Sequence, residues 1–268
     1  MILAGTKIFS ALRNTIAGFF VFFATARAVE TGSIFNTTDP GNAPWNYVGS
    51  ISGGASGVYL GAYGGNFWVL TAAHVGAGDF ILGGTTYNAV SGSSFSVTNG
   101  DSSLADLTLF RISGNPGLAN LPVASSAPAT STAVEMIGFG GGKSWGTNTI
   151  FAYTNYTLSG LPYGGSGIVT LASNGGQGVG GDSGGGLFAQ SSGTWYLAGI
   201  LSGVGPISSG GTNFGDGTLS VNFAAYYSQI SADIGSVSAI PEPSSVAMIT
   251  GLGALLCGVV ARRRSSHR

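Results

Sequence analysis

Short apolar runs recur every eight to twelve residues from Trp45 onward, with glycine, serine and asparagine between them. Typical runs are FWVLTAAHV (67–75), ADLTLFRI (105–112) and TWYLAGIL (194–201). They have the length of strands and are rich in β-branched and aromatic residues. About a dozen such runs at this spacing predict an all-β domain, either an antiparallel barrel or a sandwich.

Two segments interrupt this pattern. Residues 224–234 place Tyr227, Ile230 and Ile234 on one helical face, which predicts a closing helix. Residues 112–132 have the composition of a loop and separate two halves of similar size. A repetitive solenoid is the alternative for so many short strands, but the sequence has no fixed period of 20–50 residues, which counts against it.

Composition distinguishes this chain from a disordered low-complexity protein. Glycine contributes 48 of the 268 residues and charged residues only 7%, yet 44% of the chain is hydrophobic. Disorder needs low hydrophobicity and high net charge, so these values predict a compact domain whose many turns use glycine. The only cysteine, Cys257, lies in the last apolar run, which leaves no intrachain disulfide to support the fold.

Charge is distributed unevenly along the chain. Between residues 29 and 261 the basic residues are Arg111 and Lys143, against all ten acidic residues, so this segment has a formal charge of −8. A segment of this charge repels a phosphate backbone. The sequence therefore argues against nucleic acid as a partner.

The first 28 residues have the layout of a secretory signal. Lys7 and Arg13 precede the apolar run TIAGFFVFFATA (15–26), and the small-residue triplet ARA closes the segment. We expect export across the inner membrane, with signal peptidase cleaving before Val29. An uncleaved N-terminal anchor is the alternative.

The other end of the chain carries a second targeting pattern. The motif PEP (241–243) is followed by the apolar run VAMITGLGALLCGVVA (246–261) and then by three arginines. The 16 uncharged residues span about 24 Å as a helix, which is short but possible for a membrane span when Ser244 and Ser245 are added. This order resembles the PEP-CTERM sorting signal of Gram-negative bacteria. The resemblance implies transient anchoring by the helix, cleavage by an exosortase and delivery to the cell surface; an ordinary tail anchor is the alternative.

Two residues in apolar strands have the chemistry of a catalytic pair. His74 follows FWVLTAA and is the sole imidazole available to the folded region, because His267 lies in the basic tail. Asp106 lies inside the buried-looking strand LADLTLFRI, where a carboxylate costs several kcal/mol unless it is paired. Basic partners are scarce, and an imidazole N–H would satisfy this carboxylate well. Alone, a histidine is more often structural than catalytic.

The segment GDSGGGLF (181–188) places Ser183 among glycines. Successive glycines allow tight backbone geometry, in which the N–H groups of Gly181 and Ser183 point together at one oxygen. An oxygen that gains charge during acyl transfer needs such donors, and losing one donor costs about 3–4 kcal/mol of transition-state stabilisation. In a chain so rich in glycine, an ordinary turn before a strand is the alternative.

Taken together, VLTAAHV, DLTLFRI and GDSGGGLF resemble the motifs of the chymotrypsin-like (trypsin-fold) serine peptidases, in the family's order. LAGILSG (197–203) resembles the strand that pairs with substrate backbone in that family. The resemblance covers about residues 45–234. It implies two six-stranded antiparallel β-barrels with the site between them, protein or peptide substrates, and chemistry that needs neither metal nor cofactor.

The resemblance also assigns roles to individual residues. His74 takes the proton of Ser183 and later gives it to the leaving amine, while Asp106 orients His74 and stabilises its cation. Ser183 attacks the substrate carbonyl and forms an acyl-enzyme. The N–H groups of Gly181 and Ser183 hold the oxyanion.

Further positions follow from the same resemblance. Ser202 and Gly203 lie along the bound substrate. Gln177 stands where trypsin-like members carry an acid, which argues against cleavage after arginine or lysine, and Val204 narrows the pocket for small or medium apolar side chains. In many relatives a newly freed N-terminus pairs with the acid before the serine, here Asp182. The sequence shows no IVGG-like start after a basic residue near residues 29–45.

The sequence thus predicts an exported, surface-sorted serine endopeptidase. A catalytically inactive relative that serves as a binding or scaffold protein is the second hypothesis, and a glycine-rich surface adhesin with chance motifs is the third. The predicted organisation is a signal peptide, an N-terminal arm, a peptidase domain, a linker with the PEP motif, a transmembrane helix and a basic cytoplasmic tail, at residues 1–28, 29–44, 45–234, 235–243, 244–261 and 262–268.

Overall fold

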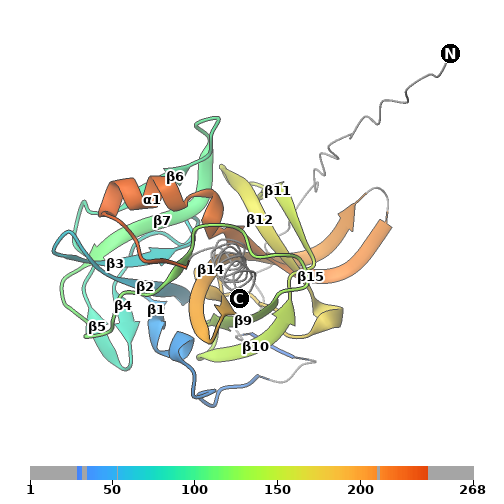
Figure 1. The fold of residues 1–268 in the computed structure, drawn as a ribbon, viewed down its shortest axis with the longest axis horizontal. Coiled ribbons are helices and arrows are strands. Elements are labelled where there is room, and N and C mark those ends of the chain that lie inside the picture. The colour runs from blue at the N-terminus through green and yellow to red at the C-terminus, as the bar shows by residue number, and fades with distance from the viewer. Residues whose placement is uncertain (1–28, 32–34, 53, 210–211, 241–268) are drawn as a thin grey trace, which may run out of the picture.

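The computed structural model describes residues 29–31, 35–52, 54–209 and 212–240. Strands dominate these residues, and one short α-helix packs against one side of the strands (Figure 1). The prediction of a mainly β domain with a C-terminal helix is confirmed.

Seven strands in the first half of the described chain pair antiparallel with one another. Their order across the sheet is β5-β4-β1-β2-β3-β7, with β6 also paired to β7. A 3₁₀ turn, η1 (Ala43–Tyr47), precedes them. The strands are β1 (Val48–Ile51), β2 (Ala55–Tyr63), β3 (Asn66–Thr71), β4 (Phe80–Leu82), β5 (Thr85–Tyr87), β6 (Phe95–Thr98) and β7 (Leu104–Ile112).

The second half forms another run of paired strands, in the order β10-β9-β13-β14-β15-β12, with β11 paired to β12. Tyr163 and Gly164 of β12 pair in parallel with Leu104 and Ala105 of β7, which joins the two halves. The elements are β8 (Val123–Ala124), β9 (Ala133–Gly138), β10 (Ser144–Thr149), β11 (Ala152–Thr157), β12 (Tyr163–Leu171), η2 (Ala172–Asn174), β13 (Gly186–Ser191), β14 (Thr194–Ser209), β15 (Thr212–Asn222), η3 (Phe223–Ala225), α1 (Tyr227–Ile234) and β16 (Ala239–Ile240).

Apolar side chains of both halves meet in one shared core. It includes Leu107 of β7, Val221 of β15, and Ile230 and Ile234 of α1, all buried. Burial of apolar area at about 25 cal/mol per Å² is what holds the strands together in a chain whose described residues contain no disulfide. The helix therefore packs into the core that the two halves share, with the apolar face that the spacing at 224–234 predicts turned inward.

Several segments differ in detail from the sequence-based expectation. The helix begins only at Tyr227, because η3 occupies the three residues Phe223–Ala225. The connecting segment 112–132 contains β8, and residues 239–240 of the predicted linker form β16, which pairs with β8. The number of barrels stays a prediction, because the strands form one continuous hydrogen-bonded sheet.

The targeting predictions lie outside the described residues: the signal peptide at 1–28, the PEP motif at 241–243, the transmembrane helix at 244–261 and the basic tail at 262–268. No helix in the described part of the chain is long and apolar enough to cross a membrane.

Candidate active site

Strand pairing brings His74 and Asp106 together. β3 ends at Thr71, which lies opposite Thr108 of β7. His74 follows three positions later and therefore lies beside Asp106, the third residue of β7. The His74 Nδ1 atom lies 2.9 Å from Asp106 Oδ2 and 3.0 Å from Oδ1, and the backbone N–H of His74 donates to Oδ1 at 3.0 Å. The His74 side chain keeps 13% of its surface exposed, whereas that of Asp106 has none. The Nδ1 edge of the imidazole is thus held by a buried carboxylate.

A further donor completes the shell of Asp106. The Ser202 hydroxyl donates to Asp106 Oδ2 at 2.5 Å. With the two groups of His74, this makes three donors around a carboxylate that no lysine or arginine contacts in the described chain. A buried carboxylate held by several donors stays in one orientation, and it can stabilise positive charge on the imidazole it faces.

The loop before β13 is shaped by close backbone approaches that only glycine permits. Gly184 has φ +85°, and a Cβ there would lie 2.0 Å from the carbonyl oxygen of Ser56. Gly181 has φ +93°, and its Cβ would lie 2.6 Å from Cα of Gly140. These two glycines are required by geometry. The glycine richness of the segment is therefore a condition of the loop that carries Ser183.

Ser56 of β2 fastens this loop to the other half of the molecule, and sequence reasoning missed it. Its N–H donates to the carbonyl of Ser183 at 2.9 Å, and its hydroxyl donates to that of Gly181 at 3.2 Å. Ser56 Oγ also accepts the N–H of Phe139 at 2.8 Å. The side chain is fully buried. One serine among many carries no sequence signal of such a role, which depends on strand placement.

The Ser183 hydroxyl joins the same network through Ser202. Ser183 Oγ donates to the carbonyl oxygen of Ser202 at 3.5 Å, while the Ser202 side chain holds Asp106. Within the described residues, no hydrogen bond joins Ser183 Oγ to His74. Catalytic hydrogen bonds are often long before substrate binds, and they tighten in the substrate complex. The structure thus brings His74 and Asp106 into direct contact and links Ser183 to them by way of Ser202.

Two backbone donors beside Ser183 are unused. In the described part of the chain, neither the N–H of Gly181 nor that of Ser183 donates a hydrogen bond, whereas the N–H groups of Asp182, Gly184 and Gly185 all do. Free N–H groups on either side of one residue can both bind an external oxygen. The arrangement can hold an anionic oxygen next to Ser183.

Asp182 is buried, and no cationic side chain in the described ranges contacts it. Its side chain is 1% exposed and accepts the N–H of Val179 at 2.9 Å and that of Gly140 at 3.2 Å. Burial raises the pKa of this carboxyl to about 7, the two N–H donors lower it, and the nearby Glu30 raises it further. The carboxylate is therefore short of a positive partner.

Gly178, the residue after Gln177, lies against the side chains of Val204 and Thr218. The N–H of Gly178 donates to Thr218 Oγ1 at 2.8 Å, and a Cβ on Gly178 would contact Thr218 Cγ2 and Val204 Cγ1. Val204 and Thr218 are paired across β14 and β15. Two branched side chains thus narrow this region, and the second was not identified from the sequence because it depends on strand register.

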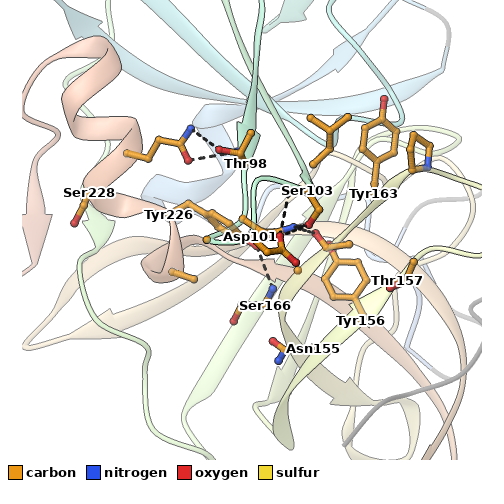
Figure 2. Close-up of a pocket in the computed structure, with 18 residues that line it drawn as sticks. Thr98, Asp101, Ser103, Asn155, Tyr156, Thr157, Tyr163, Ser166, Tyr226 and Ser228 are labelled. Carbon is orange, nitrogen blue, oxygen red and sulfur yellow. Dashed lines mark hydrogen bonds between the residues drawn. The ribbon is translucent and has the colours of Figure 1, made fainter. Parts of the chain in front are cut away.

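A separate cavity of about 860 Å³ lies between the β6–β7 turn, the β11–β12 hairpin and the start of α1. Figure 2 shows Thr98, Asp101, Tyr156 and Tyr226 among its lining. Tyr156 is 5% exposed, and burial followed by the charge of Asp106 raises the pKa of its hydroxyl. The cavity therefore approaches the buried side of Asp106.

The lining of this cavity contains residues that connect the two halves of the molecule. The Tyr226 hydroxyl donates to Asn99 Oδ1 at 2.6 Å and accepts the N–H of Ser166 at 3.1 Å. A Cβ on Gly165 would lie 2.1 Å from that hydroxyl, so a glycine is needed there. These contacts fix β12 against the turn that leads into β7 and thus support the position of Asp106.

The described residues contain no group of three or more His, Cys, Asp or Glu side chains that could hold a metal ion. The arrangement of His74, Asp106, Ser183 and the two free N–H groups can instead carry out nucleophilic attack assisted by a base and by an anion-binding site.

Comparisons with known proteins agree with this chemistry. The profile of the Trypsin family matches residues 35–226. Among solved structures, the chain resembles the Rv3671c protease of M. tuberculosis in its inactive form, at 19% identity and a TM-score of 0.51, over 72% of this chain and 90% of that one. It also resembles mouse neuropsin, a serine protease expressed in the limbic system of the brain, at 19% identity and a TM-score of 0.53, over 74% and 97%. At these identities the two structures show the fold alone. No curated protein sequence matches the chain.

Proposed function

Because the chain belongs to the trypsin family and is a chymotrypsin-like serine endopeptidase, we propose that His74, Asp106 and Ser183 are its catalytic triad. The observation that carries the proposal is the 2.9 Å contact between His74 Nδ1 and the fully buried Asp106 carboxylate. This contact commits Nδ1 as the donor and leaves Nε2 unprotonated, which is the form that accepts the proton of a serine hydroxyl.

The reaction proceeds in two halves. Ser183 Oγ attacks the carbonyl carbon of the scissile peptide bond and loses its proton to His74 Nε2. The proton then passes to the leaving amine as the C–N bond breaks, which leaves an ester on Ser183. Water, activated by the same nitrogen, cleaves the ester and releases the acid. The unused N–H groups of Gly181 and Ser183 support a role as the oxyanion hole in both halves.

A fluorophosphonate tests this proposal, because it phosphonylates only a serine that a neighbouring base activates. We expect one adduct per chain, located on Ser183 by peptide mass spectrometry. Folded protein that forms no adduct, or forms one elsewhere, would contradict the triad. Fully unfolded protein is the matched control and should not react.

We propose that the substrate side chain before the scissile bond is small or medium and apolar. The support is that Val204 and Thr218 are paired across neighbouring strands and lie against Gly178, where their branched side chains would narrow a pocket, and that Gln177 would offer no negative charge to a basic side chain. Ser202 and Gly203 would contact the backbone of the same substrate segment. The substrates are peptides and unfolded or extended parts of proteins.

The double variant Val204→Gly, Thr218→Gly is expected to widen this pocket. The ratio of kcat/KM for a phenylalanine peptide to that for an alanine peptide should rise at least tenfold, since one misfitted methylene is already worth about 1–3 kcal/mol. Matched peptides that differ only at that residue provide the measurement, with the wild-type protein as reference. Preferred cleavage after arginine or lysine by the wild type would refute the assignment.

We propose that the protein is exported and then sorted by its C-terminal PEP-CTERM-like signal. The support is the order of features in the sequence: an N-terminal signal at 1–28 and, at the other end, the PEP motif, apolar segment and arginines. Signal peptidase and an exosortase would be the processing partners, with the membrane as a transient attachment site. An intact mass that retains both ends in exported protein would contradict this.

We further propose that export itself activates the enzyme. Removal of residues 1–28 would turn the backbone nitrogen of Val29 into an α-ammonium group. Val29 is fully buried, its carbonyl accepts the Ser144 hydroxyl at 2.8 Å, and Ser144 pairs with Gly138. A Cβ on Gly138 would lie 2.1 Å from Asp182 Oδ1. These contacts connect Val29 to Asp182 through Ser144 and Gly138, and the proposal is that the new ammonium group pairs with this buried carboxylate.

A further inference from the structure

Strand β14 continues well past the residues that border Ser183. It runs from Thr194 to Ser209, and its pairing with β15 continues to its last residue. The two strands form a long hairpin that projects on one side of the molecule, drawn in orange in Figure 1. The hairpin therefore extends well beyond Ser202, the residue that contacts Asp106.

One edge of this strand has no partner over its outer half. β13 pairs with β14 only as far as Ile200, and Leu201 completes that side with hydrogen bonds to Gly184 and Gly185. From Ser202 to Ser208, among the residues that the structure describes, backbone pairing comes from β15 alone. An unpaired edge is a template for another extended chain.

Two independent observations show which backbone groups lie on the free edge. The carbonyl of Ser202 receives the Ser183 hydroxyl, so it points away from β15. Pro206 has no N–H and pairs with Asp216, a position that a proline occupies when its nitrogen faces away from the ladder. Because outward-facing residues alternate, Val204 and Ser208 belong to the same edge.

The hairpin is held firmly against the body. Ile207 is 2% exposed, and a Cβ on Gly217 would lie 2.8 Å from its side chain. The register shifts between Ile207 and Ser208, so that Phe214 becomes an extra residue in β15. The Phe214 ring packs on Phe151 with centroids 5.1 Å apart. Packing on the β15 side fixes the hairpin and leaves the opposite edge open to solvent, where Pro206 and Ser208 are exposed.

We propose that the edge of β14 from Ser202 to Ser208 binds the N-terminal side of an extended polypeptide substrate as an added antiparallel strand. The inference rests on the proposed peptidase function and specifies its substrate class. Ser202 lies beside Ser183 and would contact the first residue before the scissile bond, and the alternation along the edge then places the third residue opposite Val204. The new part is the continuation: the fifth residue lies opposite Pro206 and the seventh opposite Ser208.

The edge has a distinctive hydrogen-bonding pattern. Val204 and Ser208 each offer an N–H and a carbonyl, whereas Pro206 offers a carbonyl only. The fifth substrate residue would therefore donate its N–H to Pro206 and find no donor for its own carbonyl. The preferred substrate is an extended segment with at least seven residues before the cleavage point and no proline at the fifth.

A series of quenched fluorescent peptides tests the proposal on the exported protein. The peptides share the sequence around the scissile bond and carry three, five or seven residues before it. Three added hydrogen bonds, each worth about 1 kcal/mol before ordering costs, should raise kcat/KM about tenfold from the shortest to the longest peptide, mainly through KM. N-methylation of the fifth residue should remove most of this gain. N-methylation of the fourth, whose N–H points away from the edge, is the matched control.

Two variants connect the effect to the edge. Ser208→Pro removes an outward N–H and should lower kcat/KM of the longest peptide about threefold, while Pro206→Ala adds one and should raise it by a similar factor. Both should leave the shortest peptide unaffected. Equal rates for all lengths, or equal effects of N-methylation at both positions, would overturn the proposal. If even the shortest peptide is not cleaved, the peptidase function itself fails; if it is cleaved without a length effect, only this inference fails.

Discussion

The variant Ser183→Ala is expected to lose about 10⁶-fold in kcat, because no other group can form the acyl-enzyme. His74→Ala should lose about as much, since an unassisted serine hydroxyl is a weak nucleophile. The double variant should be no worse than either single one, because the two groups act as a unit. Initial rates with a peptide that carries a chromogenic leaving group measure the loss.

Residual activity above the uncatalysed rate is part of the same expectation. The N–H groups of Gly181 and Ser183 belong to the backbone, and the substitution of a side chain leaves them in place to bind an oxyanion. Circular dichroism should show an unchanged fold, and Ser228→Ala, on the exposed face of α1, is the matched serine control. Retention of more than about one hundredth of the activity by Ser183→Ala would exclude Ser183 as the nucleophile.

The pairing of His74 with Asp106 was predictable because basic partners were scarce, with Arg111 and Lys143 the other candidates, and because the motifs resemble those of the family. The folded region has one imidazole, and an acid within an apolar strand needs a donor. Strand pairing then placed the two 2.9 Å apart. Ser56 and Thr218 could not be found in this way, since a serine or threonine in a strand is common and its role depends on which strand lies opposite.

The loop glycines and the free edge of β14 depended on how distant strands are aligned, which no local sequence pattern encodes. The glycines of GDSGGGLF predicted a tight loop, but which of them are sterically required became clear only from the carbonyl of Ser56 and the backbone of Gly140. The free edge of β14 is visible only once its pairing with β13 is known to stop at Ile200. Local chemistry can be read from residue types, whereas the surfaces that recognise substrate depend on where strands begin and end.

A chain that begins at Val29 is expected to have about 100-fold higher kcat/KM than one with two extra residues before Val29. In the extended chain the backbone nitrogen is an uncharged amide, and Asp182 keeps two N–H donors but no cation. A buried carboxylate without a counter-ion costs about 3–5 kcal/mol, and moving the adjacent loop relieves this cost. Such a movement displaces the oxyanion donors of Gly181 and Ser183, and loss of one donor costs about 10²-fold or more.

The free energy of unfolding should depend on pH differently in the two chains. In the extended chain the contribution of Asp182 should have the opposite sign to that of an ordinary paired acid. In the extended chain the pKa of Asp182 is raised from 3.8 to about 7, so the folded state binds the proton more tightly than the unfolded state. Its stability is therefore highest at low pH and falls as pH rises from about 4 to about 7. Between pH 5 and 7.5 this amounts to about 2.5 kcal/mol. Pairing with the Val29 ammonium lowers the pKa and removes this loss.

Denaturant unfolding of both chains at pH 5 and 7.5, together with peptide hydrolysis, measures the two effects. Buried Glu135, whose pKa is also raised, titrates in both chains and cancels in the comparison. Asp182→Asn is the control for charge: it should remove the difference in pH dependence between the chains and leave both poorly active. N-terminal acetylation of the Val29 chain should reproduce the extended form. Equal activity and parallel stability profiles for the two chains would show that Asp182 has another partner and that signal cleavage does not activate the enzyme.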